Sequence, residues 1–305
     1  MNVREMLETV RRVEIRTNRL VNDMMVGGCL SQFKGRGLDF EELREYMPGD
    51  DVRDIDWNVT NRMGRPFVKE YREERELGIV VAMDISASSA FASGTLTKRE
   101  FAAEVGATLA FSAARNGDKA ALCLFTDQVE LFLPMRKSRR HILHMIQEML
   151  FFKPRRKGTN IGSALTFLNH ILHRTSLVFL ITDFLHSFDP LKPSTSSRSA
   201  LQEIGLTNAR HDLVCIHLHD PLESQLPESG LLTVEDAETG ELLELDSRRS
   251  TLREKYAQSN ADRLNALDRS LRQTGIPSIR LNTREPFAQK LQTFFETRQR
   301  GQAWR

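Results

Sequence analysis

Four short apolar segments constrain the fold of this chain more than any other feature. They are GIVVAMDIS at 78–86, KAALCLFTD at 119–127, SLVFLITDF at 176–184 and DLVCIHL at 212–218. An apolar run of this length without polar alternation is typical of a strand that is buried on both faces, as in a parallel sheet. Stretches with helical spacing lie between these segments, so we predict an α/β domain with a mostly parallel sheet and helices on both faces.

The rest of the pattern completes this domain and leaves a separate N-terminal region. We expect two further strands, at 129–134 and 276–282, and a hairpin over 231–245 with its turn near Thr239-Gly240. Helices are expected over 98–115, 138–151, 162–173, 250–273 and 285–298, and a polar linker is expected at 189–200. Apolar positions at helical spacing predict a helix over 5–24, and the turn-rich residues 29–78 predict short strands and turns. We therefore expect an N-terminal helix with a small subdomain over 1–78 and the α/β domain over 79–305.

Composition excludes several classes of protein. The net charge of the 305 residues is +2, which is too small to indicate a nucleic-acid or membrane partner by itself. The three cysteines are far apart in the sequence and form no Cys-x-x-Cys pair, which fits a reducing compartment. The N-terminus lacks the apolar core of a secretion signal, and no stretch reaches the ~18 apolar residues of a membrane span. We expect a cytoplasmic protein without a transmembrane segment.

Polar side chains gather where the predicted strands end. The first strand runs into Asp84-Ile85-Ser86-Ala87-Ser88, the third ends at Thr182-Asp183, and Gly158-Thr159-Asn160 precedes the helix at 162–173. Because ligands bind outside the carboxyl ends of strands in an open α/β sheet, these segments should meet at one edge. Their carboxylates and hydroxyls suit Mg²⁺ or Mn²⁺. Residues 84, 86 and 88 point the same way if the backbone stays extended.

Each piece of this pattern also has a purely structural explanation. An Asp-x-Ser-x-Ser segment can cap a helix or form a turn, and Thr159 can cap the helix that follows it. The combination of all three segments at strand ends favours the metal site over these separate explanations.

The same residues resemble a known site. Together they look like the metal-ion-dependent adhesion site of von Willebrand factor A domains, and the resemblance implies five metal-site residues: Asp84, Ser86, Ser88, Thr159 and Asp183. Upstream, EYMPGDDVRDIDW at 45–57 and TNRMGRPFVKE at 60–70 resemble the hallmark segments of the bacterial domain-of-unknown-function 58 family. The two resemblances together cover about residues 35–185 and imply a von Willebrand factor A-like, doubly wound fold.

The resemblance implies binding rather than turnover. Members of that family are commonly encoded beside MoxR-type AAA+ ATPases and are thought to act as their partners or adaptors. In von Willebrand factor A domains an acidic residue of the partner completes the coordination of the metal. We therefore expect a divalent-metal-dependent protein-interaction module that is not an enzyme, whose partner is a MoxR-type ATPase or its client. The sequence has no phosphate-binding loop motif, so nucleotide hydrolysis would come from that partner.

Three other functions remain open from the sequence. A metal-dependent hydrolase would need a general base, for which His186 is the candidate. A nucleic-acid-binding protein could use two basic clusters, Arg136, Lys137, Arg139 and Arg140, and Lys153, Arg155, Arg156 and Lys157. Those clusters lack interleaved aromatic residues apart from Phe151 and Phe152, so no nucleic acid is expected. A structural domain with an empty site is the third.

A second acidic group lies upstream of the α/β domain. It consists of Asp50, Asp51, Asp54 and Asp56. Its spacing lacks the glycine and the terminal glutamate of an EF-hand loop, so a second cation site is disfavoured. We predict a structural turn in which these carboxylates pair with nearby arginines, namely Arg44, Arg53 and Arg62.

Overall fold

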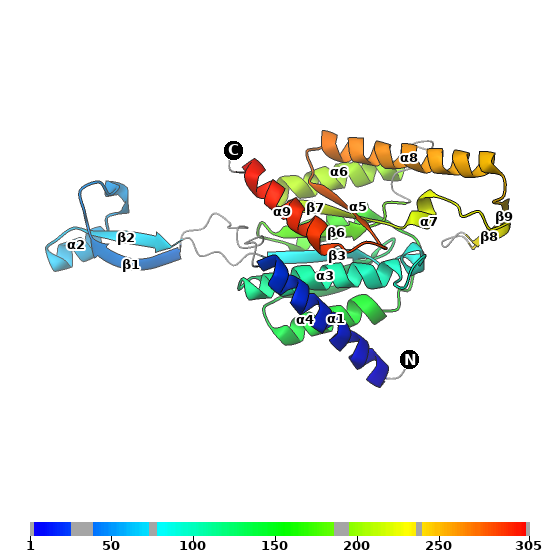
Figure 1. The fold of residues 1–305 in the computed structure, drawn as a ribbon. Coiled ribbons are helices and arrows are strands. Elements are labelled where there is room, and N and C mark those ends of the chain that lie inside the picture. Colours follow the sequence, from blue (N-terminus) through cyan, green and yellow to red (C-terminus); the bar gives the residue numbers. More distant parts are fainter. Residues whose placement is uncertain (1–2, 26–38, 73–77, 186–194, 236–239, 303–305) are drawn as a thin grey trace. The chain divides into compact units, whose positions relative to one another are not determined.

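The computed structural model describes residues 3–25, 39–72, 78–185, 195–235 and 240–302 (Figure 1). The chain divides into two compact units, one formed by Met1–Leu30 with Gly78–Arg305 and the other by Ser31–Leu77. The division differs from the expected one, because helix α1 (Val3–Met25) belongs to the larger unit. The reason is burial: the apolar side of α1, including Val13 and Val21, is buried, and the helix contacts α3 (Lys98–Arg115).

The described part of the larger unit is built on a six-stranded sheet with the strand order β10-β7-β6-β3-β4-β5. Its strands are β3 (Gly78–Asp84), β4 (Lys119–Phe125), β5 (Val129–Arg136), β6 (Leu177–Thr182), β7 (Asp212–His219) and β10 (Ser278–Asn282). All neighbouring pairs are parallel except β4 and β5. The prediction of a mixed α/β fold with a mostly parallel central sheet is therefore confirmed.

Helices cover both faces of this sheet, as Figure 1 shows for α3 and α6. Besides α1 and α3, the longer helices in the described part of this unit are α4 (Arg139–Phe151), α5 (Ile161–Ile171), α6 (Thr195–Arg210), α8 (Ser250–Gln273) and α9 (Ala288–Gln302). On one face, Val80 and Ala82 of β3 pack in a core with apolar side chains of α5, α6 and α8. On the other face, a Cβ atom on Gly106 of α3 would meet Val81 at 3.1 Å, so this glycine allows the helix to approach β3 closely.

Several boundaries differ from the expected ones. Helix α6 begins at Thr195, inside the expected linker, of which 189–194 lies outside the described residues. The hairpin of β8 (Leu231–Glu235) and β9 (Leu242–Asp246) is antiparallel as expected, although Thr239 of its expected turn lies outside the described residues. A short helix that the sequence did not suggest, α7 (Pro221–Ser224), follows β7.

The smaller unit is a strand pair with two short helical segments. Strand β1 (Asp39–Glu45) pairs antiparallel with β2 (Phe67–Arg72), and between them lie the 3₁₀ helix η1 (Val52–Asp54) and α2 (Trp57–Met63). Short strands and turns were expected here, but α2 was not. It forms because Asp56 accepts hydrogen bonds from the first backbone amides and Gly64, at φ 70°, ends the helix.

The strand order places a change of direction at the middle of the sheet. From β3 the chain adds β4 and β5 on one side, and it then returns to the other side of β3 to add β6, β7 and β10. The carboxyl ends of β3 and β6 therefore border the point where the winding reverses, which is where open α/β sheets bind ligands. In the described residues, no helix combines the length and apolar character needed to cross a bilayer.

Candidate cation-binding site

The first carboxylate of the site lies at the end of β3. Strands β3 and β6 are neighbours with Met83 beside Ile181, so the next residues, Asp84 and Thr182, also come together. The Thr182 hydroxyl donates to Asp84 Oδ2 at 2.7 Å, and the Ser86 backbone amide donates to Oδ1 at 2.9 Å. Asp84 is 6% exposed, so both of its oxygens are held in the interior by uncharged donors.

The two serines that follow Asp84 lie close together, although not by the expected route. We expected an extended segment, but Ala87–Ala90 form a 3₁₀ turn (η2) that Ser86 precedes. The turn brings the Ser86 and Ser88 hydroxyl oxygens to 3.1 Å from each other, and both side chains are buried. The 3₁₀ turn thus gathers the hydroxyls that an extended backbone was expected to align.

The second carboxylate follows β6. The Leu185 backbone amide donates to Asp183 Oδ1 at 3.1 Å, which leaves Oδ2 directed at another partner. Between them, Phe184 has a φ of 53°, a left-handed conformation that is uncommon for a bulky residue and turns the chain sharply after the strand. The Phe184 ring is buried against His217 at 5.7 Å between ring centroids.

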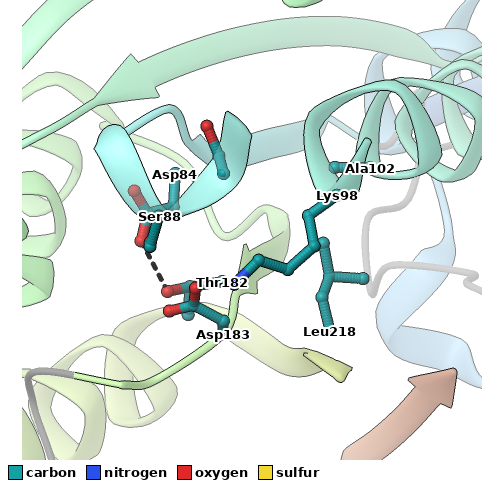
Figure 2. A pocket seen from close by; sticks show the side chains of 8 residues that line it. Asp84, Ser88, Lys98, Ala102, Thr182, Asp183 and Leu218 are labelled. Carbon is teal, nitrogen blue, oxygen red and sulfur yellow. Dashed lines mark hydrogen bonds and ion pairs between the residues drawn. The ribbon is translucent and has the colours of Figure 1, made fainter. Parts of the chain in front are cut away.

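A lysine supplies the partner of Asp183. Lys98, the first residue of α3, extends toward the carboxylates (Figure 2), and its Nζ donates to Asp183 Oδ2 at 2.5 Å. The same Nζ also donates to Glu223 Oε1 on α7. Lys98 is 1% exposed. The site therefore contains a buried ammonium group between two carboxylates, which the sequence did not suggest.

Thr159 occupies the neighbouring loop between α4 and α5. The loop is joined to the serine turn because the Ala87 amide donates to the Lys157 carbonyl oxygen at 3.0 Å, and it is joined to β4 because the Asn160 amide donates to Thr126. Of the five predicted residues, the structure brings Asp84, Ser86, Ser88 and Asp183 into one buried group. It places half-buried Thr159 beside this group on a separate segment.

The family comparison decides what this chain is related to. The model of the family "Protein of unknown function DUF58" matches residues 42–266. The chain belongs to this family. The uncharacterized protein Rv1480 of Mycobacterium tuberculosis is 28% identical over 294 residues, which cover 96% of this chain and 89% of that protein.

Two solved structures resemble the DUF58 chain more distantly. The conserved hypothetical protein BatB from Bacteroides thetaiotaomicron is 14% identical with a TM-score of 0.45, covering 72% of this chain and 98% of that chain. An aerotolerance-related membrane protein from Bacteroides fragilis is 14% identical with a TM-score of 0.47, covering 72% of this chain and 99% of that chain.

The two buried aspartates of the DUF58 chain differ in their charge. Burial and the nearby Asp183 charge raise the pKa of Asp84 to about 7. Burial also opposes ionisation of Asp183, but the charge and hydrogen bond of Lys98 outweigh it and lower the pKa of Asp183. Burial disfavours the ammonium form of Lys98, yet Asp183 and Glu223 raise its pKa above the usual value. At neutral pH, Asp183 and Lys98 form an ion pair, whereas Asp84 is close to its titration midpoint.

A cavity of about 10 Å³ lies among these side chains, lined by Asp84, Ser88, Ser89, Lys98, Ala102, Thr182, Asp183 and Leu218. This volume is about that of one water molecule or one small ion. Oxygen atoms dominate the polar lining, which fits a hard cation such as Mg²⁺. In the part of the DUF58 chain that the structure describes, no three His, Cys, Asp or Glu side chains form a metal-binding group. Serine hydroxyls would therefore have to complete the ligand set.

One residue of each basic cluster and one of the acidic cluster form ion pairs in the described residues. Arg139 pairs with Glu14 of α1, with 2.7 Å from Nε to Oε1, beside a groove of about 900 Å³ between α1 and α4. Arg156 pairs with Asp127 at 3.1 Å. In the smaller unit, Asp50 forms two hydrogen bonds with Arg44, at 2.7 and 2.9 Å, which is one of the predicted arginine pairings, while Asp51 and Asp56 accept backbone amides.

Sequence reasoning missed Lys98 and Glu223. Lys98 follows Thr97, whose side chain caps α3, and a charged residue in a first helical turn ordinarily faces solvent. Glu223 stands three residues after Asp220 in a capping box, a pattern that is readable from the sequence. That pattern predicts the short helix but not the second oxygen of Glu223, which reaches Lys98.

Proposed function

We propose that this protein is a divalent-cation-dependent protein-interaction module with a von Willebrand factor A-like fold. The cation is Mg²⁺ or Mn²⁺, and its ligands come from Asp84, Ser86, Ser88, Thr159 and Asp183. The observation that carries the proposal is the convergence of buried carboxylates and hydroxyls around a water-sized cavity, at the edge where the winding of the sheet reverses.

The ligand chemistry favours binding over catalysis. Because the hydroxyl ligands are neutral, they leave the charge of the ion less compensated than a set of carboxylates alone would, so a remaining coordination position attracts an acidic side chain from outside. The cavity lining includes no histidine or cysteine among the described residues. His217, whose pKa burial lowers to about 3, packs beside Phe184 and does not line the cavity. His186, the candidate base of a hydrolase, lies outside the described residues.

The partner we propose is a protein with an exposed acidic residue, namely a MoxR-type AAA+ ATPase or its client. The basic loop that leads to Thr159 supports this choice, because the Ala87–Lys157 hydrogen bond joins Lys157 to the serine turn, and the same loop carries Lys153 and Arg155. Positive charge at that position speeds the approach of an acidic surface. We propose a cytoplasmic setting for this interaction.

Calorimetric titration of MgCl₂ and MnCl₂ into metal-free protein tests the proposal. We expect saturable one-site binding to the wild-type protein that Asp183→Ala abolishes. Asp268→Ala is the control, because it removes a partly exposed carboxylate from an arginine pair on α8 that does not line the cavity. Binding that survives Asp183→Ala, or that Asp268→Ala removes equally, would refute the assigned site.

The partner and the competing functions need separate measurements. Cross-linking to a MoxR-type ATPase should increase with MgCl₂ and fall with a chelator. Metal-dependent hydrolysis of a generic phosphoester would instead identify an enzyme. Salt-sensitive retention of an oligonucleotide would identify a nucleic-acid-binding protein that uses the basic clusters.

A further inference from the structure

A buried lysine lies inside the site to which we assign a divalent cation, and the proposed function does not use it. Lys98 has 1% of its surface exposed, and its Nζ donates to Asp183 and to Glu223. Charged lysines are seldom fully buried unless they are paired, because leaving water is costly for the ammonium group. In this structure Lys98 provides the positive charge that the carboxylates require.

The ammonium group and a divalent ion need the same oxygen atom. Asp183 Oδ1 accepts the Leu185 amide, whereas Oδ2 accepts from Lys98 Nζ at 2.5 Å. A divalent ion bound to that oxygen would lie at about 2.0–2.6 Å. The cavity of about 10 Å³ beside Lys98 has room for one small species. A divalent ion at this oxygen would therefore stand next to an ammonium group of like charge, in a cavity with room for only one small species.

We propose that Lys98 is a built-in cation of the site, which releases Asp183 when a divalent ion binds and keeps Glu223 as its partner. This inference rests on the proposed function, since it concerns the same site. It makes metal binding an exchange of one cation for another. The apparent affinity for the divalent ion is then lower than the oxygen ligands alone would give.

Glu223 is placed to retain the released ammonium group. Its Oε1 accepts from Lys98, while its Oε2 accepts the Asp220 backbone amide at 3.2 Å, so the carboxylate is anchored independently of Asp183. Asp220 is itself fully buried and accepts from Ser93 and Thr283. The exchange therefore takes place next to a fixed carboxylate, and the Lys98 side chain has to move only its tip.

Two substitutions should shift metal affinity in opposite directions. Lys98→Met removes the competing cation, so we expect Mg²⁺ and Mn²⁺ to bind at least about tenfold more tightly than to the wild-type protein. Glu223→Gln removes the carboxylate that retains the ammonium group, so we expect at least about threefold weaker binding. A merely structural role for the ion-pair network would weaken binding in both variants. Opposite shifts would therefore exclude a merely structural role.

This inference is tested by calorimetric titration of MgCl₂ and MnCl₂ into the metal-free full chain. Thermal unfolding in the absence and presence of about 10 mM MgCl₂ is the second readout. Lys290→Met is the control, because it breaks an exposed ion pair with Glu285 by the same chemical change, and its metal affinity should equal that of the wild-type protein. Should Lys98→Met fail to fold without metal, Lys98→Gln, which keeps a hydrogen-bond donor but carries no charge, replaces it with the same expected tightening of metal binding.

The outcomes separate this inference from the proposed function. Tighter binding by Lys98→Met together with weaker binding by Glu223→Gln supports the exchange. Unchanged or weaker binding by Lys98→Met, or unchanged or tighter binding by Glu223→Gln, overturns it, and the metal site stands if Asp183→Ala still abolishes binding. Absence of binding to the wild-type protein and to both variants overturns the exchange and the proposed metal site together.

Discussion

The acidic segment of the smaller unit and the carboxylates of the cation site differ in how they are assembled. In the smaller unit the aspartates are neighbours in the sequence, and each described contact is local: Asp50 pairs with Arg44, and Asp51 and Asp56 accept backbone amides of the helices they precede. In the cation site, Asp84 and Asp183 come from strands that are far apart in the sequence. Aspartates that are close together in the sequence thus form turns and helix caps here, whereas aspartates at the ends of neighbouring strands form a buried site.

Asp50 and Asp84, one aspartate from each region, also show pKa shifts in opposite directions. Hydrogen bonds from Arg44 and from the Met47 amide lower the pKa of Asp50 to about 2. Burial, together with the Asp183 charge, raises the pKa of Asp84 to about 7. A partly exposed carboxylate such as Asp50 gains an ionic partner while losing little water, whereas a buried one loses its water and depends on the cation that the fold supplies. The cation site is therefore where single substitutions should cost most.

The largest expected effect is the loss of the buried ion pair. Asp183→Ala removes a carboxylate that Lys98 contacts at 2.5 Å and leaves the buried ammonium with one partner. Removing one member of a buried pair typically costs about 3–5 kcal/mol, and Glu223 offsets part of this, so we expect a loss of about 3 kcal/mol in the free energy of unfolding. Urea denaturation of the metal-free protein measures it.

Asp50→Ala is the matched comparison in the smaller unit. It also removes an aspartate from an arginine pair, but the Asp50 carboxylate is close to solvent and the pair is partly exposed. Its effect on the urea midpoint of the larger unit should be within the error of the measurement. If Asp50→Ala and Asp183→Ala lowered the free energy of unfolding equally, burial would not be what distinguishes the ion pairs of the two regions.

The second expected effect is on the pH dependence of stability. A folded-state pKa of about 7 for Asp84, against 3.8 for an ordinary aspartate, means that the folded protein binds a proton more tightly than the unfolded chain. The stability that this contributes is complete below about pH 4 and is lost as the pH rises through 7. Asp84→Asn keeps the shape and removes the titration, so the variant should gain stability relative to wild type by on the order of 3 kcal/mol between those limits.

The free energy of unfolding has to be measured against pH for both the wild-type protein and Asp84→Asn, because other groups titrate in the same pH range. Burial lowers the pKa of His217 to about 3, which makes stability rise with pH up to about 6.5 in both proteins. Burial raises the pKa of Glu223, which acts in the same direction as Asp84. Subtracting the wild-type curve from the Asp84→Asn curve, both measured with a chelator, removes these contributions. A flat difference curve would show that Asp84 stays ionised throughout.

Much of the larger unit could be predicted because its signals are local. The apolar runs gave β3, β4, β6 and β7 to within a few residues, since a strand buried on both faces needs a continuous apolar segment. Asp84 and Asp183 were also correctly expected at the same edge of the sheet, because the carboxyl ends of parallel strands lie together whatever their side chains are.

The rest depended on contacts that leave no local pattern. Helix α1 belongs to the larger unit because it packs against α3. An amphipathic sequence does not reveal which surface its apolar side will contact. The 3₁₀ turn after Asp84 replaced the expected extended segment because Ser86 and Ala87 are bound through the Asp84 carboxylate and the Lys157 carbonyl. The burial of Lys98 arises only when α3, β6 and α7 are assembled together.

A third expected effect sharpens the comparison within the smaller unit. Asp56 accepts the amides of Asn58 and Val59, at 2.9 and 3.2 Å, as the N-cap of α2. Asp56→Ala should therefore destabilise α2 by about 1 kcal/mol, whereas Asp56→Asn should cost much less because asparagine caps equally well. Hydrogen exchange at the amides of α2 measures this. If Asp56→Asn costs as much as Asp56→Ala, the charge of Asp56 matters rather than its capping oxygen.

The smallest expected effect concerns the Arg44–Asp50 pair. Arg44→Met removes the main cause of the lowered pKa of Asp50, so its titration midpoint should move from about 2 toward the ordinary 3.8, although the Met47 amide at 2.8 Å holds it partly down. The stability from this pair is present above about pH 4 and is lost as the pH falls through 2, so the variant should differ little from wild type at low pH. NMR titration of the aspartate carboxyl carbons measures the shift, and Asp246, whose pKa Arg248 lowers, is the internal reference that should not move. An Asp50 midpoint that stays near 2 would mean that backbone amides alone hold this carboxylate ionised, and the segment would then be organised by its turn rather than by charge pairing.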